Sequence, residues 1–337
     1  MIKDLTISVD DNIAALGSCS AGSKMLENFK PLFTATAIER LIECGVKIGE
    51  KSDVSEFGLG FNPPCKYDTR ISVDANAEPR ITAYRDGKIC YKPSYGVISR
   101  YGIVSTVASS ETISISGSNL DIITSLAEIM SGPDPRDGTL TGKKLSFTKD
   151  SNIKGKRIAV IAEHFETKKY IKLLNNAMSD FRTAVAFVEK ISVPEVKVVQ
   201  AVYLTMIGAE VCNNLSKYDG VKYGYRSPNA KTLEEIYIMS RSEAFGLGAK
   251  AYILLGSEIL SKENYEKYYV KALKIRRLLK NKFDEIYKNF DAVLLPIDGD
   301  ELSSLLGQPS IVINGVQLMA NNFEDNKLIN IARGLIV

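Results

Sequence analysis

Three short runs of consecutive apolar residues restrict most strongly what this chain of 337 residues can fold into. They cover residues 157–162, 184–188 and 291–295, and each adjoins a segment whose apolar residues have helical spacing. A strand that is apolar at successive positions buries both of its faces, as strands do in a sheet that helices cover on each side. Strands that alternate with helices are typical of α/β proteins. The sequence therefore predicts an α/β fold with a mixed central sheet flanked by helices on both faces.

The longest helical pattern covers residues 262–290. Ile275, Leu279 and Phe283 belong to an apolar stripe of helical period, which predicts one unbroken helix of about 43 Å, at about 1.5 Å per residue, packed on the sheet. The other positions hold nine Lys or Arg against four acidic residues. This charge excess fits either a solvated face or an electrostatic docking surface.

Shorter elements are predicted between these landmarks. Residues 70–73 and 80–84 are expected to be extended, and a helix capped by Ser118 is expected to end at Gly132. No stretch has the composition of a long linker, so residues 1–337 are predicted to form a single domain.

Composition narrows the functional classes. The 43 basic and 40 acidic residues give a net charge of only +3, so no direct contact with nucleic acid is expected. No apolar run approaches the ~18 residues of a membrane span, and the first residues lack the apolar core of a secretory signal. The five cysteines have no CxxC spacing, which favours free thiols over disulfides or a metal site. We therefore expect a cytoplasmic protein without membrane contact, metal or cofactor.

Several blocks of the chain resemble the amidase signature family, in the family's order. Residues 92–102, KPSYGVISRYG, resemble the family string K-P-T-Y-G-R-V-S-R-Y-G, and residues 305–315, LLGQPSIVING, resemble L-A-G-L-P-A-I-S-V-P-C-G. Residues 216–226, SKYDGVKYGYR, are similar to A-R-Y-D-G-V-R-Y-G-Y-R of the A subunit of the aspartyl/glutamyl-tRNA amidotransferase. The resemblance covers roughly four-fifths of the chain. It implies the amidase-signature fold, in a shortened form.

The resemblance also implies where catalytic residues belong. Family members use a Ser–cis-Ser–Lys triad, with the lysine in V-K-D-N, the bridging serine in G-G-S-S-G-G-S and the nucleophile in D-T-G-G-S-I-R. Here Asp10 stands at the lysine position. Neither serine string is found between Gly60 and Lys92, where Gly87 is the only glycine that could line an oxyanion hole. We therefore assign no catalytic residue and expect the triad to be missing.

Other residues near these positions could in principle replace the triad. Ser72 and Ser94 are the nearest serines, and Cys65 and Cys90 lie in the altered segment without a nearby histidine. The only histidine, His164, is far along the chain and fits a surface or capping role better than a base.

Two further alternatives concern charged residues. Lys51 matches the second lysine of the family, in a K-T-N string, rather than the triad lysine. Asp10 and Asp11 could act as a carboxylate pair or hold Mg²⁺, but a solvated turn is the simpler explanation of both.

Part of the family's substrate site is matched. Tyr223, Tyr225 and Arg276 stand where the resemblance implies residues that hold glutamine, and a guanidinium can bind an α-carboxylate through two hydrogen bonds. Packing and a solvated helix face would account for the same three residues.

Two hypotheses follow from the resemblance. The first is a protein that resembles the A subunit, has lost amidase activity and acts as a scaffold or partner-binding protein. Its partner would be the tRNA-acting B subunit or another subunit of the amidotransferase. The second is a functional glutamine amidase that supplies ammonia, as part of the enzyme, for transamidation of misacylated Glu-tRNA(Gln) or Asp-tRNA(Asn).

Overall fold

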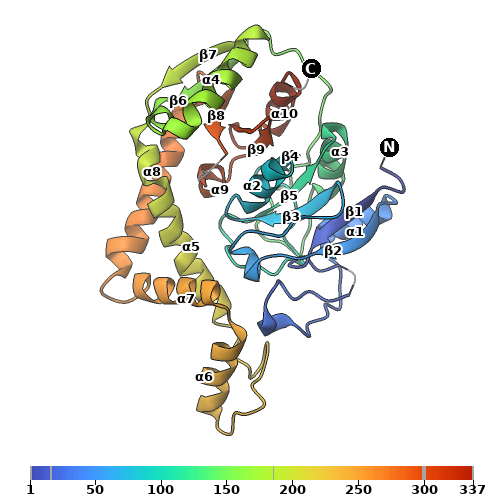
Figure 1. Ribbon diagram of the computed structural model, residues 1–337, viewed down its shortest axis with the longest axis vertical. Coiled ribbons are helices and arrows are strands. Elements are labelled where there is room, and N and C mark those ends of the chain that lie inside the picture. Colours follow the sequence, from blue (N-terminus) through green and yellow to red (C-terminus); the bar gives the residue numbers. More distant parts are fainter. Residues whose placement is uncertain (1, 16, 185, 298–300, 336–337) are drawn as a thin grey trace.

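The computed structural model describes residues 2–15, 17–184, 186–297 and 301–335. It contains a ten-stranded mixed sheet in the order β2-β1-β3-β5-β4-β9-β10-β8-β6-β7 (Figure 1). Pairs β1–β2, β1–β3, β6–β7 and β6–β8 are parallel, and the other neighbours are antiparallel. The strands are β1 (Thr6–Asp10), β2 (Lys47–Ser52), β3 (Arg70–Asp74), β4 (Ile89–Lys92), β5 (Thr112–Gly117), β6 (Arg157–Ile161), β7 (Phe187–Ile191), β8 (Ala292–Pro296), β9 (Ser310–Ile313) and β10 (Val316–Met319).

The sheet separates two hydrophobic cores. In β8, Ala292 and Leu294 belong to one core, whereas Val293 and Leu295 belong to the other. Successive side chains of a strand point to opposite faces, so an unbroken apolar run supplies both cores at once. The observed sheet confirms the predicted α/β fold with helices on both faces.

Helices cover both faces of the sheet. The first core is closed by α1 (Thr36–Glu43), α3 (Leu120–Met130), α4 (Lys168–Thr183) and α10 (Asp325–Arg333). The second is closed by α5 (Val199–Leu215), α7 (Leu247–Ile259), α8 (Lys271–Ile286) and the short α9 (Leu302–Leu306). Helix α6 (Leu233–Ala244) extends away from the sheet beyond α7 (Figure 1). None of the described helices is both long and apolar enough to cross a membrane.

One segment has a different structure from the prediction. Residues 80–84 are helical, within α2 (Glu78–Arg85), instead of extended. Pro79 lies in the first turn, where its fixed φ and missing N–H suit a helix start, and Ala77 before it has a left-handed φ of 67°. Pro79 therefore belongs to the start of a helix.

Two other boundaries also differ. The predicted strand at residues 184–188 begins later, as β7, and lies at an edge of the sheet, where Phe187 is exposed. The predicted helix over residues 262–290 is a π-helical segment (Tyr265–Val270) followed by α8, so the α-helix itself has 16 residues and a length of about 24 Å.

The cap of α3 also lies one residue from its predicted position. Asn119, and not Ser118, caps the helix through its side-chain oxygen, which accepts from the N–H groups of Asp121 and Ile122. The Ser118 hydroxyl donates to Asp68 instead. Gly132 follows the helix end with a φ of 116°, as expected for a glycine at that position.

Candidate functional site

The candidate site begins with a buried ion pair at the ends of two neighbouring strands. Asp10 ends β1 and Arg70 begins β3, and these parallel strands pair directly. Arg70 Nε donates to Asp10 Oδ1 at 2.5 Å, and both side chains are buried. The other guanidinium nitrogens donate to the carbonyls of Pro63 and Asp53, each at 3.1 Å. The residue at the expected lysine position is therefore a carboxylate held by arginine.

A second buried carboxyl group lies in the same cluster. Glu78 is the first residue of α2, and its Oε1 accepts from the Asn62 N–H at 2.7 Å and from the Thr82 hydroxyl. Within the described structure, Oδ2 of Asp10 and Oε2 of Glu78 are buried and accept no hydrogen bond. Two carboxyl groups thus share the neighbourhood of one arginine.

Burial changes the protonation of both acids. It raises the pKa of Asp10 to about 6, although the Arg70 charge opposes that shift. It also raises the pKa of Glu78 to about 7, against the hydrogen bonds from Thr82 and Asn62. Arginine keeps its proton in proteins, so Arg70 cannot serve as a base. The two carboxyl groups are therefore the proton-holding groups of the cluster.

The space at this cluster is very small. Arg70, Ser72 and Glu78 line a cavity of about 10 Å³, and Ser72 itself is buried. A cavity of this size holds one water molecule at most. An amide substrate could not reach Ser72 or either carboxyl group in this conformation.

A network of polar side chains fixes the adjoining turn between β3 and α2. Arg80 Nε donates to Asp74 Oδ2 at 2.7 Å, and the remaining nitrogens reach the hydroxyls of Ser303 and Ser304, each at 2.8 Å. Asp74 Oδ1 accepts from the Ala77 N–H at 3.1 Å. The turn is thereby tied to α9.

Arg70, Glu78 and this network were missed by the sequence analysis. A usable signal was nevertheless present, because residues 74–80 read DANAEPR and carry Asp and Arg at the two ends, as in D-T-G-G-S-I-R. No local sequence pattern predicts the role of Arg70, because it contacts Asp10 only through the pairing of β1 with β3.

Ser94 and Lys92 form buried hydrogen bonds that link strand β4 and the residues just after it to the C-terminal part of the chain. The Ser94 hydroxyl donates to Asp325 Oδ2 at 2.6 Å. Lys92 is fully buried, and its Nζ donates to the carbonyls of Gln308 and Ser303, at 2.8 and 3.3 Å. Burial lowers the pKa of Lys92 to about 7. Neither residue contacts the Asp10–Glu78 cluster through a hydrogen bond in the described structure.

Of the remaining candidates, Cys65 lines the same small cavity as Ser72 and Glu78, where its sulfur lies 3.2 Å from the Ser52 hydroxyl, whereas the others lie elsewhere. Burial raises the pKa of the Cys90 thiol, which disfavours a thiolate, and all five cysteines are free. Burial lowers the pKa of His164 to about 4. Lys51 Nζ lies 3.0 Å from an Asp11 oxygen, so Asp11 is paired with Lys51 whereas Asp10 is paired with Arg70. Across residues 2–15, 17–184, 186–297 and 301–335, no cluster of three acidic, His or Cys side chains could hold a metal ion.

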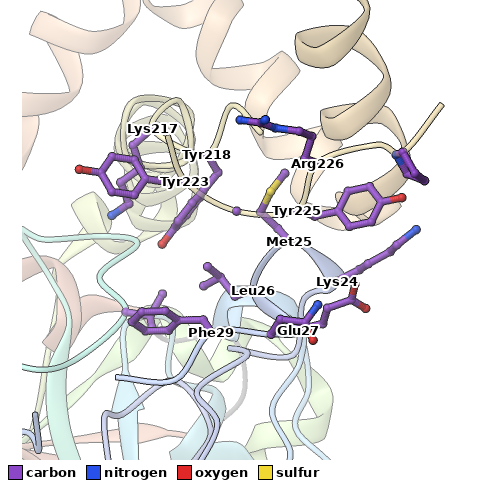
Figure 2. A pocket seen from close by; sticks show the side chains of 14 residues that line it. Lys24, Met25, Leu26, Glu27, Phe29, Lys217, Tyr218, Tyr223, Tyr225 and Arg226 are labelled. Carbon is purple, nitrogen blue, oxygen red and sulfur yellow. The ribbon is translucent and has the colours of Figure 1, made fainter. Parts of the chain in front are cut away.

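The three predicted substrate-binding residues lie in two places. Tyr223 and Tyr225 line a cavity of about 760 Å³, where Tyr223 is 61% exposed and the Tyr225 hydroxyl donates to Glu243 (Figure 2). Arg276 does not line this cavity. It donates to the carbonyls of Leu305 and Ser109, at 2.6 and 3.1 Å. The structure therefore brings the tyrosines together and places the arginine in a tertiary cross-link.

Comparison with known proteins agrees with this fold. The Amidase family model matches residues 87–322. The A subunit of glutamyl-tRNA(Gln) amidotransferase from Limosilactobacillus reuteri is 31% identical over 327 residues, which cover 86% of this chain and 66% of that protein. The protein of the same name from Saccharolobus solfataricus is 31% identical over 329 residues, which cover 88% and 69%. The chain thus spans about two thirds of the length of these relatives.

Solved structures show the same fold. The A subunit of the same enzyme from Thermotoga maritima superposes with a TM-score of 0.81 at 24% identity, covering 99% of this chain and 84% of that one. Peptide amidase from Stenotrophomonas maltophilia superposes with a TM-score of 0.80 at 19% identity, covering 99% of this chain and 82% of that one. The family model and the relatives of 31% identity show that the chain belongs to the amidase family. Within the family, its relatives place it in the lineage of the glutamyl-tRNA(Gln) amidotransferase A subunit.

Proposed function

We propose that this chain is a relative of the amidotransferase A subunit that has lost amide hydrolysis and serves as a scaffold for a partner protein. The observation that carries the proposal is the buried cluster of Asp10, Arg70 and Glu78. The proposal treats residues 1–337 as one cytoplasmic domain, in keeping with a single sheet whose strands come from residues 6–319.

The cluster occupies the positions that catalysis would need. If residues 74–80 correspond to D-T-G-G-S-I-R, Glu78 stands at the serine nucleophile and Asp10 at the lysine. The lysine should accept a proton in its neutral form, whereas Asp10 is paired with a permanent cation. Glu78 offers a carboxylate without access for a substrate. Under this correspondence, both the proton acceptor (the lysine) and the nucleophile (the serine) of the triad are replaced.

The same correspondence removes a donor from the oxyanion hole. Asn76 and Ala77 would replace the two glycines of the string. The Ala77 N–H already donates to Asp74 at 3.1 Å, so it is not directed at a developing oxyanion. Loss of one such donor costs about 100- to 1,000-fold in turnover in hydrolases.

Exposed apolar side chains support the partner-binding half of the proposal. Leu247 and Leu254 on α7 are 86% and 71% exposed, and Leu233 and Ile238 on the projecting α6 are also exposed (Figure 1). Large apolar side chains that are exposed on two consecutive helices are candidates for an interaction site. The curated relatives are named as subunits, so we propose the tRNA-acting B subunit, or another subunit of the amidotransferase, as the occupant.

The test measures activity and assembly separately. Ammonia release from glutamine and asparagine is assayed with and without the B subunit encoded in the same genome, and complex formation is followed by size-exclusion chromatography. We expect no ammonia release above the buffer rate, and a complex that Leu247→Asp and Leu254→Asp weaken. Leu278→Asp, at a 65% exposed site on α8, is the matched control and should leave the complex intact. Failure of the chain to bind the B subunit would contradict the choice of partner.

The alternative function is a glutamine amidase that supplies ammonia to the rest of the amidotransferase. It is favoured by one observation, the 31% identity to relatives named as amidotransferase subunits. Turnover of glutamine that a Ser72, Ser94, Cys65 or Cys90 substitution abolishes would support this alternative and identify the nucleophile.

A further inference from the structure

We propose that the cavity between the 3₁₀ turn η1 (Lys24–Leu26) and the loop of residues 217–228 binds a small organic anion with an aromatic or aliphatic body. This ligand site goes beyond the proposed scaffold role, because it requires neither a partner protein nor amide chemistry.

The shape of the cavity suits a small molecule. Its volume of about 760 Å³ lies within the ~300–1,000 Å³ typical of ligand sites. Figure 2 shows Tyr218 and Tyr223 on one side, facing Leu26 and Phe29 on the other. Leu26 and Tyr218 are buried, whereas Phe29 and Tyr223 remain exposed. The cavity thus has an apolar interior and two aromatic side chains accessible to solvent.

The two walls are joined to each other without a ligand. The Tyr225 N–H donates to the Met25 carbonyl at 2.8 Å, which links the loop to η1. Gly224 has a φ of +86°, and a Cβ there would lie 2.4 Å from the Met25 sulfur, so this close approach requires glycine. The Tyr218 ring stacks on Phe57 with centroids 5.6 Å apart. The cavity is therefore formed in advance of binding.

Lys217 supplies the charge that a ligand would meet. Its ammonium forms no hydrogen bond or ion pair within the described part of the chain, and its nearest aromatic ring is that of Tyr218 at 5.1 Å. Lys217 is exposed at the mouth of the cavity, and partial desolvation lowers its pKa while the Glu111 charge opposes that shift. A carboxylate, sulfonate or phosphate in the cavity would place a counter-charge beside its ammonium.

The other charged residues of the lining leave the excess positive. Lys24 lies over the Tyr225 ring at 4.2 Å, and Arg226 donates to the carbonyls of Gly220 and Val221. Glu27 is the one acidic residue of the lining within the described structure. Three cations against one carboxylate favour an anion over a cation or a zwitterion.

The cavity is separate from the buried acids. It shares no lining residue with the small cavity beside Arg70 and Glu78, and Arg276 lies outside it. A ligand in it would therefore not be positioned for hydrolysis by Asp10 or Glu78. The apolar walls also fit a larger apolar body than that of glutamine.

The absence of tryptophan from the chain allows a site-specific test. Phe29→Trp would place the only indole at the cavity, where it can transfer energy to a bound naphthalene dye. The charged probe is 8-anilinonaphthalene-1-sulfonate, and its uncharged counterpart is N-phenyl-1-naphthylamine. We expect saturable energy transfer to the sulfonate at one site per chain.

Charge substitutions then test the role of Lys217. In the Phe29→Trp background, Lys217→Met should weaken sulfonate binding about tenfold, as expected for loss of one charge-assisted contact, and change binding of the uncharged dye less than about twofold. Lys222→Met, an exposed lysine of the same loop outside the lining, should change neither. Equal loss of both dyes in Lys217→Met, unchanged sulfonate binding, or no saturable transfer would overturn the proposal. Circular dichroism of each variant confirms that it is folded.

Discussion

Arg70 Nε lies 2.5 Å from Asp10 Oδ1, at the point where strands β1 and β3 run side by side in the sheet. Both side chains are buried, and the remaining Arg70 nitrogens bond to backbone carbonyls. Removing one partner of such a pair leaves an uncompensated charge in the interior, which costs far more than the loss of a surface ion pair.

Arg70→Met should therefore destabilise the protein by about 3–5 kcal/mol at pH 8, because it leaves the buried Asp10 carboxylate without its cation. Asp4→Asn is the control, because Asp4 pairs with Lys47 at the surface, and it should cost less than about 1 kcal/mol. Urea unfolding followed by circular dichroism measures both. Equal losses in the two variants would show that the Asp10–Arg70 pair is not buried as described.

Asp10→Lys should not restore activity. It would set a second cation against Arg70, and Glu78 would still stand in place of a serine under the proposed correspondence. Members of a catalytic triad act as a unit, so one restored member recovers little. We expect no ammonia release from glutamine and a lower unfolding midpoint than that of the wild type. Measurable turnover by this single variant would contradict the assignment of Glu78.

Glu78 should make stability depend on pH in a defined direction. Its pKa is about 7 in the folded protein, against an ordinary value of 4.5, so the folded state binds the proton more tightly. Protonation of Glu78 therefore contributes roughly 3 kcal/mol to the free energy of unfolding. This contribution is fully present below pH ~4.5 and is lost as the pH rises to about 7.

Glu78→Gln removes this titration while keeping an oxygen acceptor for the Asn62 N–H. The variant should match the wild type near pH 4.5 and be more stable than it at pH 8, which urea midpoints at several pH values would show. Asp10 titrates in both proteins, so the difference between the two curves reports the Glu78 titration together with its coupling to Asp10. An unchanged pH slope in the variant would show that Glu78 is ionised in the folded state at neutral pH.

The sheet and its two cores could be predicted from the sequence because the apolar runs at β6 and β8 carry the information locally. The ends of α8 could not, because the π-helical turn before it keeps the same residue types as the helix. Arg70 could not be anticipated either, since its partner is 60 residues away in the chain.

The candidate site was predictable in part. The segment between Gly60 and Lys92, which lacks the expected serine strings, is the segment that contains Arg70 and Glu78. Tyr223 and Tyr225 do line a cavity, but α9 lies against Arg276 and its Leu305 carbonyl binds the guanidinium. Long-range packing of this kind leaves no trace in residue spacing.

The apolar stripe of α8 gives a stability test with a neighbouring control. Leu279 is buried in the second core, so Leu279→Ala should cost roughly 2–5 kcal/mol. Leu278, one position earlier, faces solvent, and Leu278→Ala should change stability by less than about 0.5 kcal/mol. Chemical denaturation distinguishes the two. A small loss for Leu279→Ala would mean that this part of α8 does not pack on α5 in the second core.

We propose that Asp10 and Glu78 occupy the positions of catalytic residues and that the chain does not hydrolyse amides. The most direct measurement is ammonia release from glutamine by the purified wild-type chain, alone and with the B subunit, against a bacterial glutamyl-tRNA(Gln) amidotransferase complex as positive control. The account predicts a rate equal to that of buffer in both conditions. Release that saturates with glutamine and disappears when Ser72, Ser94, Cys65 or Cys90 is substituted would contradict it.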